Sequence, residues 1–599
     1  MDIFGILSMI GGLALFLYGM EAMGAGLSKL SGGRMERLLE KLTSKRIMAV
    51  LLGAGVTAVI QSSSATTVMV VGFVNSGIMK LNQAVGIIMG ANIGTTITSW
   101  LLSLTGIQGS SFVLKMLKPS SFSPILAIVG IIFIMFTKDE KKKDIGGIFL
   151  GFAILMYGME AMSGAVAPLA DNEKFTGILT MFSNPILGLL AGTILTAVIQ
   201  SSSASVGILQ ALCATGAVNF STALPIIMGQ NIGTCVTAII SSIGTSKNAK
   251  RAAAVHLFFN ISGTVIFMVV FYTLNTFVHF SFLNTAASPA GIAVIHSLFN
   301  IGATILLFPF SNLLEKMAIL AIPDKGSEVE EMEEEKINPD LARLDERFLD
   351  KPGFAMEECR GVAINMARKS KKAMNLAIDL LKEYDEKTSA RVEKLENQID
   401  QYEDALGTYL VKLSERDLSV KESRTLSVLL HCIGDFERIS DHAVNIRDAA
   451  VEMNKKNLQF SDKAKQELLV FSNAIRDIID RAVLAFETGD TGLAKEVEPL
   501  EQVVDALNKE EKQRHINRLR TGTCTIELGF VLSDISTNFE RAADHCSNIA
   551  VCLLQVDEGG FDTHEYLDIL KEENSEEFRH EYMELSEKYA LPESKHGGK

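Results

Sequence analysis

The chain has 599 residues, of which 48% are hydrophobic and 21% are charged, and its net charge is -14. This length exceeds that of one ordinary domain, so two or three units are expected. The seven cysteines include no close Cys-x-x-Cys pair, which argues against a disulfide framework and against a zinc site. No P-loop, nucleophile elbow or His-based metal motif occurs, so neither an enzyme nor a nucleic-acid partner is expected.

The charges are divided unevenly along the chain. Residues 1–320 hold 18 Lys and Arg against 11 Asp and Glu, a surplus of 7, which leaves the remainder at -21. No acidic residue occurs between Glu40 and Asp139, or between Glu173 and Glu315. A charge at the bilayer centre costs about 2.5–3.5 kcal/mol, so these apolar stretches are expected to lie in a lipid bilayer.

We therefore predict a transmembrane domain at residues 1–323, placed in the cell (inner) membrane, whose first apolar segment at 4–27 is retained rather than removed as a signal peptide. The positive-inside rule places three basic segments in the cytoplasm: Lys29 to Arg46, Lys138 to Lys143 and Lys247 to Arg251. Full spans then fit at about 4–27, 84–104, 121–137, 145–165, 221–243, 252–275 and 290–309. This topology puts the N-terminus outside and the C-terminal domain in the cytoplasm.

The membrane part repeats itself at one constant offset, the offset that relates Thr57 to Thr196. Three segments recur at this offset: Thr57–Ala65 at Thr196–Ala204, Tyr18–Met23 at Tyr157–Met162, and Ile87–Thr95 at Ile226–Thr234, where only Ala91 becomes Gln230. Three matches at one spacing without an insertion indicate a duplicated unit. We place the two repeats at about 1–144 and 145–310.

Each repeat contains an apolar stretch that is too long for one span and is broken at its centre by Gln and three Ser. Residues 47–79 begin and end inside because Arg46 and Lys80 flank them, and residues 183–219 begin and end outside. Each stretch is predicted to be a re-entrant helical hairpin, which makes the second repeat inverted relative to the first. Inverted repeats with broken helices are a recurring plan of secondary transporters.

The breaks at Gln61–Ala65 and Gln200–Ala204 offer hydroxyls, an amide and freed backbone groups. Unpaired N–H groups at a helix N-terminus suit an anion, and carbonyl and hydroxyl oxygens suit sodium. A second polar set, Asn92–Thr96 and Asn231–Thr234, follows at equal spacing in both repeats. The breaks contain no Asp, Glu or His, so coupling to protons is not expected. The alternative is that the Ser and Thr residues only serve helix packing.

The paired Gln-Ser-Ser-Ser-Ala segments, with Gly90–Thr95 and Gly229–Thr234, resemble the type II sodium–phosphate cotransporter family over roughly residues 5–310. The resemblance implies sodium-coupled import of inorganic phosphate by alternating access. It also implies a set of residues that bind sodium and phosphate: Gln61, Ser62, Ser63, Ser64, Asn92, Thr95, Gln200, Ser201, Ser202, Ser203, Asn231 and Thr234. The division of these residues between sodium and phosphate stays open, as does a homo-oligomer.

Two further pairs of membrane residues need an interpretation. Glu21 and Glu160 are equivalent acids near span ends, for which an interfacial role is preferred over ion binding. His256 and His296 begin the similar segments His-Leu-Phe-Phe-Asn and His-Ser-Leu-Phe-Asn, and are interpreted as packing and helix-end groups.

An acidic linker is predicted at 324–340, followed by a helical domain at 341–560 and a charged tail at 561–599. This domain also repeats, because Phe436–Ile446 matches Phe539–Ile549. Two three-helix bundles in tandem are expected, and the whole chain is expected to be all-α.

Glu437, Asp441 and Asn445 share one helix face, so they are able to ligate a metal cluster together with acids on a neighbouring helix; the alternative is a solvated acidic face paired with Arg438 and Arg541. The repeated Glu-Arg-x-x-Asp-His-x-x-Asn-Ile pattern resembles the PhoU family of phosphate-regulatory proteins, in which such motifs bind metal clusters. The resemblance implies ten candidate ligands: Glu396, Asp400, Glu437, Asp441, Asn445, Glu501, Asp505, Glu540, Asp544 and Asn548. Asp435 is replaced by Asn538 in the second copy, which predicts a weaker second site.

Two other functions stay open from the sequence. The membrane part could bind phosphate without transporting it, as a sensor that controls the soluble part. It could also carry another oxyanion, such as sulfate or arsenate.

Overall fold

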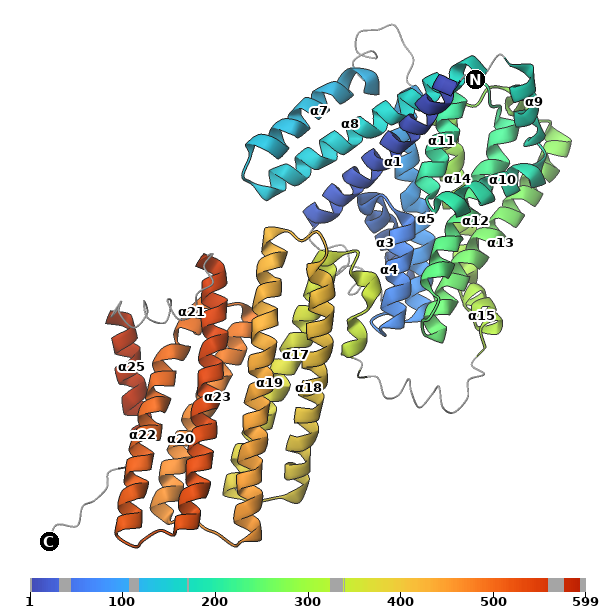
Figure 1. Ribbon diagram of the computed structural model, residues 1–599. Helices are drawn as coiled ribbons and strands as arrows, with labels where there is room; N and C mark the ends of the chain where they lie inside the picture. Colours follow the sequence, from blue (N-terminus) through green and yellow to red (C-terminus); the bar gives the residue numbers. More distant parts are fainter. Residues whose placement is uncertain are drawn as a thin grey trace. The chain divides into compact units, whose positions relative to one another are not determined.

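The structure, a computed structural model, describes residues 3–31, 45–106, 118–169, 172–323, 338, 340–558 and 576–592. The described residues form α-helices with short 3-10 turns and a single isolated bridge between Asn219 and Ala286, so the all-α prediction is confirmed (Figure 1). The chain divides into two compact units, Met1–Phe354 and Ala355–Lys599. Most of the linker predicted at 324–340 and much of the tail predicted at 561–599 lie outside the described residues.

The first unit is helical throughout its described part. Its α-helices are α1 (Ile3–Ser31), α3 (Arg46–Ile60), α4 (Ser63–Asn75), α5 (Leu81–Ser103), α7 (Pro119–Phe136), α8 (Glu140–Val166), α9 (Glu173–Met181), α10 (Pro185–Ile199), α11 (Ser202–Ala214), α12 (Phe220–Ser241), α13 (Lys247–Val278), α14 (Pro289–Leu307) and α15 (Ser311–Ala321). Short 3-10 turns lie at Leu104–Gly106, Ala167–Leu169, Ser281–Asn284, Phe308–Phe310, Leu341–Arg343 (η5) and Glu346–Phe348 (η6).

Several of these helices are long and apolar enough to cross a membrane. Among the described residues there are six such stretches: Ile3–Leu30, Leu81–Gly106, Lys141–Leu169, Phe220–Ser241, Lys247–Val278 and Pro289–Ala321. The seventh span expected at 121–137 corresponds to α7, which belongs with α3, α4, α10 and α11 to a shorter apolar class. A membrane location follows from this composition, because such surfaces are solvated by lipid and not by water.

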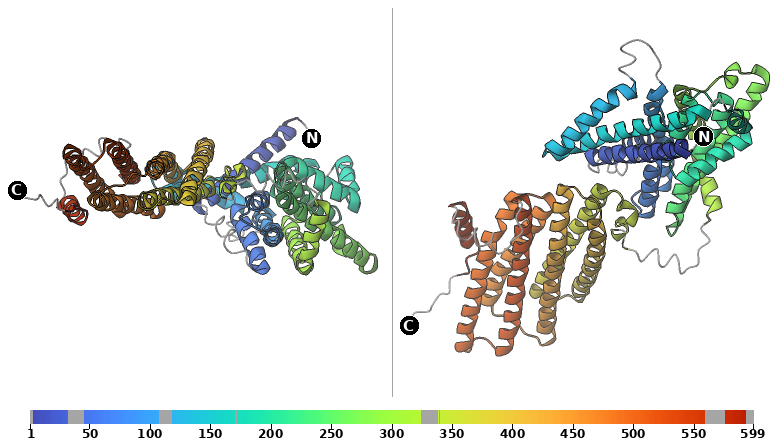
Figure 2. Two further views of the ribbon diagram at one scale, coloured as in Figure 1. Left: turned by 90° about the horizontal axis from the view of Figure 1, so that it is seen from below. Right: turned by 45° about the horizontal axis from the view of Figure 1, so that its top comes forward.

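Helices of the first unit approach one another through small residues. α1 packs along α8, and α8 packs along α7, as the right-hand view of Figure 2 shows. α3 packs on α5 in the first repeat, as α10 packs on α12 in the second. A Cβ added to Gly90 of α5 would lie 2.0 Å from the carbonyl oxygen of Val50, and one added to Gly229 of α12 would lie 2.0 Å from that of Leu189. The two equivalent glycines therefore set the helix separation, as small residues do in membrane proteins.

The second unit holds the rest of a helix that begins in the first unit, α17 (Pro352–Lys382), followed by further long helices. These are α18 (Glu386–Ser414), α19 (Val420–Lys455), α20 (Asp462–Thr488), the short α21 (Thr491–Lys495), α22 (Val497–Arg520), α23 (Ile526–Glu558) and α25 (Glu576–Lys588). α18 packs on α19, and α22 and α20 pack on α23, while α19 and α23 join the two bundles (Figure 1).

Each bundle of the second unit has an apolar core and well-defined helix ends. Phe471 of α20 packs edge-on against Phe539 of α23 within one bundle, with ring centroids 5.2 Å apart, and Phe436 of α19 packs likewise against Phe486 of α20 between the bundles at 4.9 Å. α19 begins with a capping box, in which the Ser419 hydroxyl accepts from the Glu422 backbone N–H and the Glu422 carboxylate accepts from the Ser419 N–H. The amphipathic spacing of the sequence thus produces compact helical bundles.

Candidate functional site

The first Gln-Ser-Ser-Ser segment separates α3 from α4. Gln61 ends α3 in the left-handed conformation, with φ 60° and ψ 20°, and its backbone N–H donates to the Thr57 carbonyl at 2.8 Å. Ser62 is extended, and its hydroxyl accepts from the Ala65 N–H at 3.1 Å, which caps the N-terminus of α4. A glutamine with positive φ is uncommon, and such backbone is concentrated at functional sites.

The second segment repeats this geometry between α10 and α11. Gln200 has φ 59° and ψ 20°, and its N–H donates to the Thr196 carbonyl at 2.7 Å. The Ser201 hydroxyl accepts from the Ala204 N–H at 3.2 Å. Identical sequences have therefore produced the same interruption twice, with a new helix N-terminus beginning directly after each break.

The two breaks lie side by side in the first unit. The Ser64 hydroxyl, from the first break, donates to the Gln200 carbonyl oxygen of the second break at 3.4 Å. Thr237 of α12 donates to the same oxygen at 3.5 Å, and Thr98 of α5 donates to the side-chain oxygen of Gln61 at 2.9 Å. Thr98 and Thr237 were not among the predicted site residues, although the offset between the repeats relates them to each other.

Burial differs between the breaks. Ser63 and Ser202, at the first position of each new helix, are both 4% exposed. Gln61 is 6% exposed, whereas its equivalent Gln200 is exposed. Ser62, Ser64 and Ser201 are partly buried, and Ser203 is buried. The breaks therefore differ in two places: Gln200 is more exposed than its equivalent Gln61, and Ser203 is more buried than its equivalent Ser64.

The asparagines of the second polar set are each held by another asparagine. The Asn92 amide donates to Asn260 of α13 at 2.8 Å, and the Asn231 amide donates to Asn300 of α14 at 3.0 Å. All four side chains are at most 5% exposed. Asn260 and Asn300 were missed by the sequence analysis, although each is the last residue of one of the two similar His-initiated segments.

The predicted site residues Thr95 and Thr234 each form a hydrogen bond within their own helix. The Thr95 hydroxyl donates to the Ala91 carbonyl at 3.1 Å, and the Thr234 hydroxyl donates to the Gln230 carbonyl at 3.0 Å. Each hydroxyl thus bonds its own helix one turn back. The hydroxyl oxygens keep acceptor lone pairs for a cation.

In the second unit the two copies of the repeated motif face each other. His442 Nδ1 lies 2.8 Å from the side-chain oxygen of Asn538, and His545 Nδ1 lies 2.8 Å from a carboxylate oxygen of Asp435. The two histidine rings stack with centroids 5.6 Å apart. The Asp435-to-Asn538 replacement, from which a weaker second metal site was predicted, therefore falls at the contact between the copies.

Two predicted metal ligands also lie at this contact. The Asn445 amide donates to Asn538 at 3.0 Å, and the Asn548 amide donates to Asp435 at 3.4 Å. These asparagines are engaged across the junction of α19 and α23.

Comparisons with known proteins agree with the division of the chain into two parts. The Na+/Pi-cotransporter family matches residues 15–164 and again residues 154–295, and the PhoU domain matches residues 363–450 and again 468–553. The chain joins a Na+/Pi-cotransporter membrane part to a PhoU domain. Both matches are to transport and regulatory proteins and not to an enzyme family.

The chain is similar to proteins that align with different fractions of its length. A Salmonella typhimurium protein, named "Putative inorganic phosphate export protein YjbB", is 24% identical over 86% of this chain and 91% of its own length. The rat "Sodium-dependent phosphate transport protein 2A" is 39% identical over 18% of this chain and 17% of its own length. The crystal structure of PhoU from Pseudomonas aeruginosa covers 34% of this chain and 97% of its own, with 21% identity and a TM-score of 0.33.

The other residues singled out in the Na+/Pi-cotransporter part have distinct environments. Glu21 of α1 and Glu160 of α8 are exposed. His256 and His296 are each 1% exposed, and their ring nitrogens have no hydrogen-bond partner among the described residues. Their backbone carbonyls accept from the Asn260 and Asn300 amides, at 3.0 Å and 2.8 Å. The histidines thus lie next to the asparagine pairs.

In the PhoU part the predicted acidic ligands lie close to one another. Burial and then the neighbouring Asp441 carboxylate raise the pKa of Glu437 to about 7. Burial, Asp441 and Asp400 also raise the pKa of Glu396. In the second copy burial, then Glu540 and Asp505, raise the pKa of Asp544. Acids of neighbouring helices therefore face each other in both bundles.

Ion pairs with arginine neutralise part of this acidic charge. Arg438 lies 3.6 Å from Glu437 and 3.7 Å from Asp441, as the alternative of a solvated acidic face requires. Across the described ranges, no group of three or more His, Cys, Asp or Glu side chains is arranged to hold a metal ion. The metal site, which includes Glu501 of α22, stays a prediction.

Proposed function

We propose that the protein is a sodium-coupled secondary transporter of inorganic phosphate, and that its PhoU part modulates transport from the cytoplasm. The observation that carries the proposal is the 3.4 Å contact between the Ser64 hydroxyl and the Gln200 carbonyl, because it joins the two breaks. Membership of the membrane part in the Na+/Pi-cotransporter family supports phosphate and sodium as the transported ions.

The breaks supply groups for both signs of charge. The N-termini of α4 and α11 present backbone N–H groups and the hydroxyls of Ser63 and Ser202, which suit the oxygens of phosphate. The carbonyl and side-chain oxygens of Gln61 and Gln200 suit sodium. An anion and a cation held together in a low-dielectric site attract each other strongly, which reduces the cost of removing either from water.

Transport follows if the two breaks belong to hairpins that enter from opposite sides of the membrane. In this proposal the hairpins at 47–79 and 183–219 are re-entrant and the second repeat is inverted, so the site opens to each side in turn. The equal lengths of α3 and α10, and of α4 and α11, support two equivalent hairpins. The basic residues near Arg46, Lys80 and Lys247 support a cytoplasmic location for the PhoU part.

Import is the direction that an inward sodium gradient drives through a symporter. The name of the Salmonella relative instead favours export of inorganic phosphate, which is the second candidate. The two directions share one site and differ in whether sodium and phosphate move together. We propose import because the breaks contain neutral oxygens suited to sodium directly beside anion-binding helix N-termini.

The proposed regulatory role includes a metal cluster on the PhoU part. Burial, and then repulsion from Asp441, raise the pKa of Glu437 to about 7, and a bound cation would relieve the repulsion. The candidate ligands of the first copy are Glu396, Asp400, Glu437, Asp441 and Asn445, with Glu501, Asp505, Glu540, Asp544 and Asn548 in the second.

Radiolabelled phosphate uptake into proteoliposomes tests the proposal. We expect uptake with sodium outside and potassium inside, no uptake when potassium replaces sodium, and reversal when the sodium gradient is reversed. Unlabelled phosphate should compete better than sulfate or arsenate. Uptake that is unchanged in potassium contradicts the coupling, and binding without accumulation supports the sensor instead. Vesicles that lose preloaded phosphate against an inward sodium gradient support export.

A further inference from the structure

The chain that follows the membrane helices returns to the end of the first break's helix. η6 and the first turn of α17 bring Phe348 and Phe354, which are 0% and 1% exposed, against Phe73 of α4. The three ring centroids are 4.9 to 5.3 Å apart. A Cβ on Gly72 would lie 2.7 Å from the Phe348 ring, so the glycine provides the room that this ring occupies.

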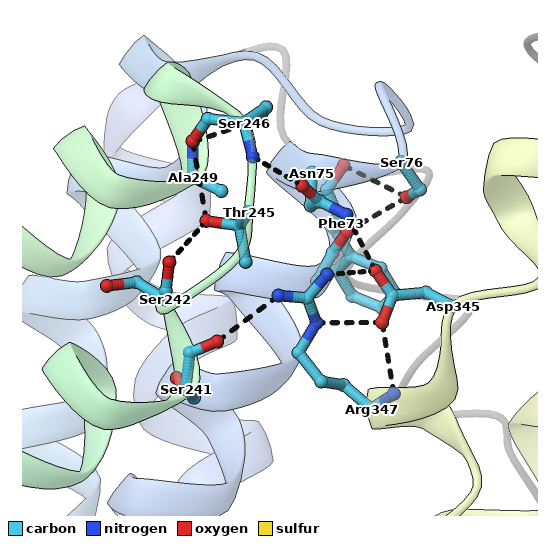
Figure 3. A network of polar contacts seen from close by, with 11 residues as sticks. Phe73, Asn75, Ser76, Ser241, Ser242, Thr245, Ser246, Ala249, Asp345 and Arg347 are labelled. Carbon is cyan, nitrogen blue, oxygen red and sulfur yellow. Dashed lines mark hydrogen bonds and ion pairs between the residues drawn. The ribbon is translucent and has the colours of Figure 1, made fainter. Parts of the chain in front are cut away.

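Polar contacts next to these rings connect α4 to the turn between α12 and α13 (Figure 3). The Asn75 amide donates to Asp345 at 2.9 Å, and the Asn75 side-chain oxygen accepts from the Ser246 N–H at 2.8 Å. Ser246 is the N-cap of α13. One side chain at the end of α4 thus contacts both the returning segment and the second repeat.

An ion pair completes the connection. Arg347 donates to Asp345 through its backbone N–H at 3.0 Å, through Nε at 2.7 Å and through a second guanidinium nitrogen. Its Nη1 donates to the Ser241 carbonyl, at the end of α12, at 3.2 Å. Asp345 and Ser241 are therefore linked by one guanidinium group, as Figure 3 shows. We call the segment from Asp345 to Phe354 the clasp.

The clasp fits only the first of the two equivalent helices. At the offset between the repeats, Gly72, Phe73 and Asn75 become Ala211, Leu212 and Ala214. The turn that follows is the same in both copies, since Gly77 and Gly216 have φ of 74° and 77°. Duplication therefore kept the helix end and its turn, while the three residues that receive the clasp differ in the second copy.

We infer that the clasp is an autoinhibitory lock, which holds the first hairpin to the second repeat and slows transport until the PhoU part releases it. The inference rests on the proposed function, because alternating access requires the first hairpin to move relative to the second repeat. The clasp joins these two parts through Asn75, Ser241 and Ser246. α17 begins inside the clasp at Pro352 and continues to Lys382 in the second unit, so a movement of this helix acts directly on Phe354.

The test measures initial rates of sodium-dependent phosphate uptake with the full chain in proteoliposomes. Arg347→Ala removes the polar link and Phe348→Ala removes the ring contact. Loss of even one hydrogen bond shifts a two-state equilibrium about fivefold, and each variant removes at least that much, so we expect each to transport at least about fivefold faster than wild type. Arg391→Ala, at an exposed position of α18, is the matched control and is expected to transport at the wild-type rate.

Folding of each variant is checked by gel filtration and helical circular dichroism, and Arg347→Lys and Phe348→Leu replace any alanine variant that does not stay monodisperse. Folded variants that transport at or below the wild-type rate, while wild type transports normally, overturn the lock alone. Wild-type protein without sodium-dependent uptake overturns the proposed function. The lock is supported if both the polar and the aromatic variants are faster and the control is not.

Discussion

Both parts of the chain contain a duplicated motif that contacts its own copy, but the two contacts use different chemistry. In the membrane part Ser64 meets Gln200 through neutral groups at 3.4 Å. In the PhoU part the contact uses ionisable groups, with Asp435 and His545 at 2.8 Å. Neutral hydrogen bonding is the less costly choice where the surroundings are lipid, and charge is tolerated at a surface that water reaches.

Within each part, the two copies form the same contacts only where their residues are the same. Thr57 and Thr66 share a hydrogen bond of 3.0 Å between their hydroxyls, but the equivalent Thr196 and Ser205 have buried hydroxyls without a partner among the described residues. In the PhoU part the core pair Leu406 and Ile433 is matched by Glu511 and Ser536, whose side chains hydrogen-bond at 2.6 Å. The copies therefore differ in hydrogen bonding where their residues differ.

The largest expected effect is on folding, at the glycines that both repeats use in the same way. Gly90→Val and Gly229→Val each place a side chain about 2.0 Å from a backbone oxygen of the neighbouring helix. Overpacking of this kind costs about 3 kcal/mol or more, so we expect both variants to lose most of their monodisperse protein in gel filtration. Gly55→Ala of α3, where a Cβ meets nothing within 4 Å, should leave the yield unchanged. A normal yield for only one variant would show that the repeats do not pack equivalently.

A smaller effect is expected at the serines that begin the helices after the breaks. Ser63→Ala and Ser202→Ala each remove a hydroxyl from a position that is 4% exposed. A hydrogen bond to a charged ligand contributes about 1.5–3 kcal/mol, so we expect sodium-dependent phosphate uptake to fall about 10- to 100-fold in each variant. Thr276→Ala, at an exposed position near the end of α13, serves as the control. If either serine variant takes up phosphate at the wild-type rate, the break that contains this serine is not part of the binding site.

The smallest change in a measured quantity, a few degrees in unfolding temperature, is expected at the buried carboxyl group of the second bundle. Burial raises the pKa of Glu511 to about 7, against 4.5 for an ordinary glutamate. The folded state then holds the proton more tightly, so the stabilisation is complete below about pH 4.5 and is lost as the pH rises towards 7. A pKa difference of this size corresponds to about 3–4 kcal/mol when the carboxyl group is ionised in both states.

Glu511→Gln keeps a group that accepts from Ser536 and removes the titration. We expect its unfolding temperature to exceed that of wild type by several degrees at pH 8 and by much less at pH 5. Glu527→Gln, at an exposed position of α23, should follow wild type at both pH values. A Glu511→Gln protein that keeps the wild-type pH dependence would assign the titration to other groups.

The sequence was sufficient to predict the all-α fold and the two breaks, because identical segments at one constant offset impose the same local structure on both. Thr98 and Thr237 could have been found with the same offset. Asn260 and Asn300 could not be assigned roles, since Asn260 meets Asn92 across 168 residues and no local pattern encodes that contact. The contact between Asn75 and Asp345, which are separated by 270 residues, could not be predicted from the sequence either.

Local patterns also left open which neighbours some residues contact. The helical spacing correctly placed Glu437 and Asp441 on one face, and their pKa shifts reflect this proximity. It did not show that Asn445 and Asn548 contact the other copy of the motif, because that depends on how α19 packs on α23. Tertiary packing, rather than periodicity, decides which neighbour a polar face meets.

The central claim is that the two breaks hold phosphate and sodium at one shared site. Equilibrium binding of labelled phosphate to the purified protein, measured across sodium concentrations with potassium as the balancing cation, tests it most directly. The account predicts that sodium strengthens phosphate binding at least tenfold, and that phosphate strengthens sodium binding by the same factor, because linkage is reciprocal. Phosphate affinity that is equal in sodium and potassium would contradict it.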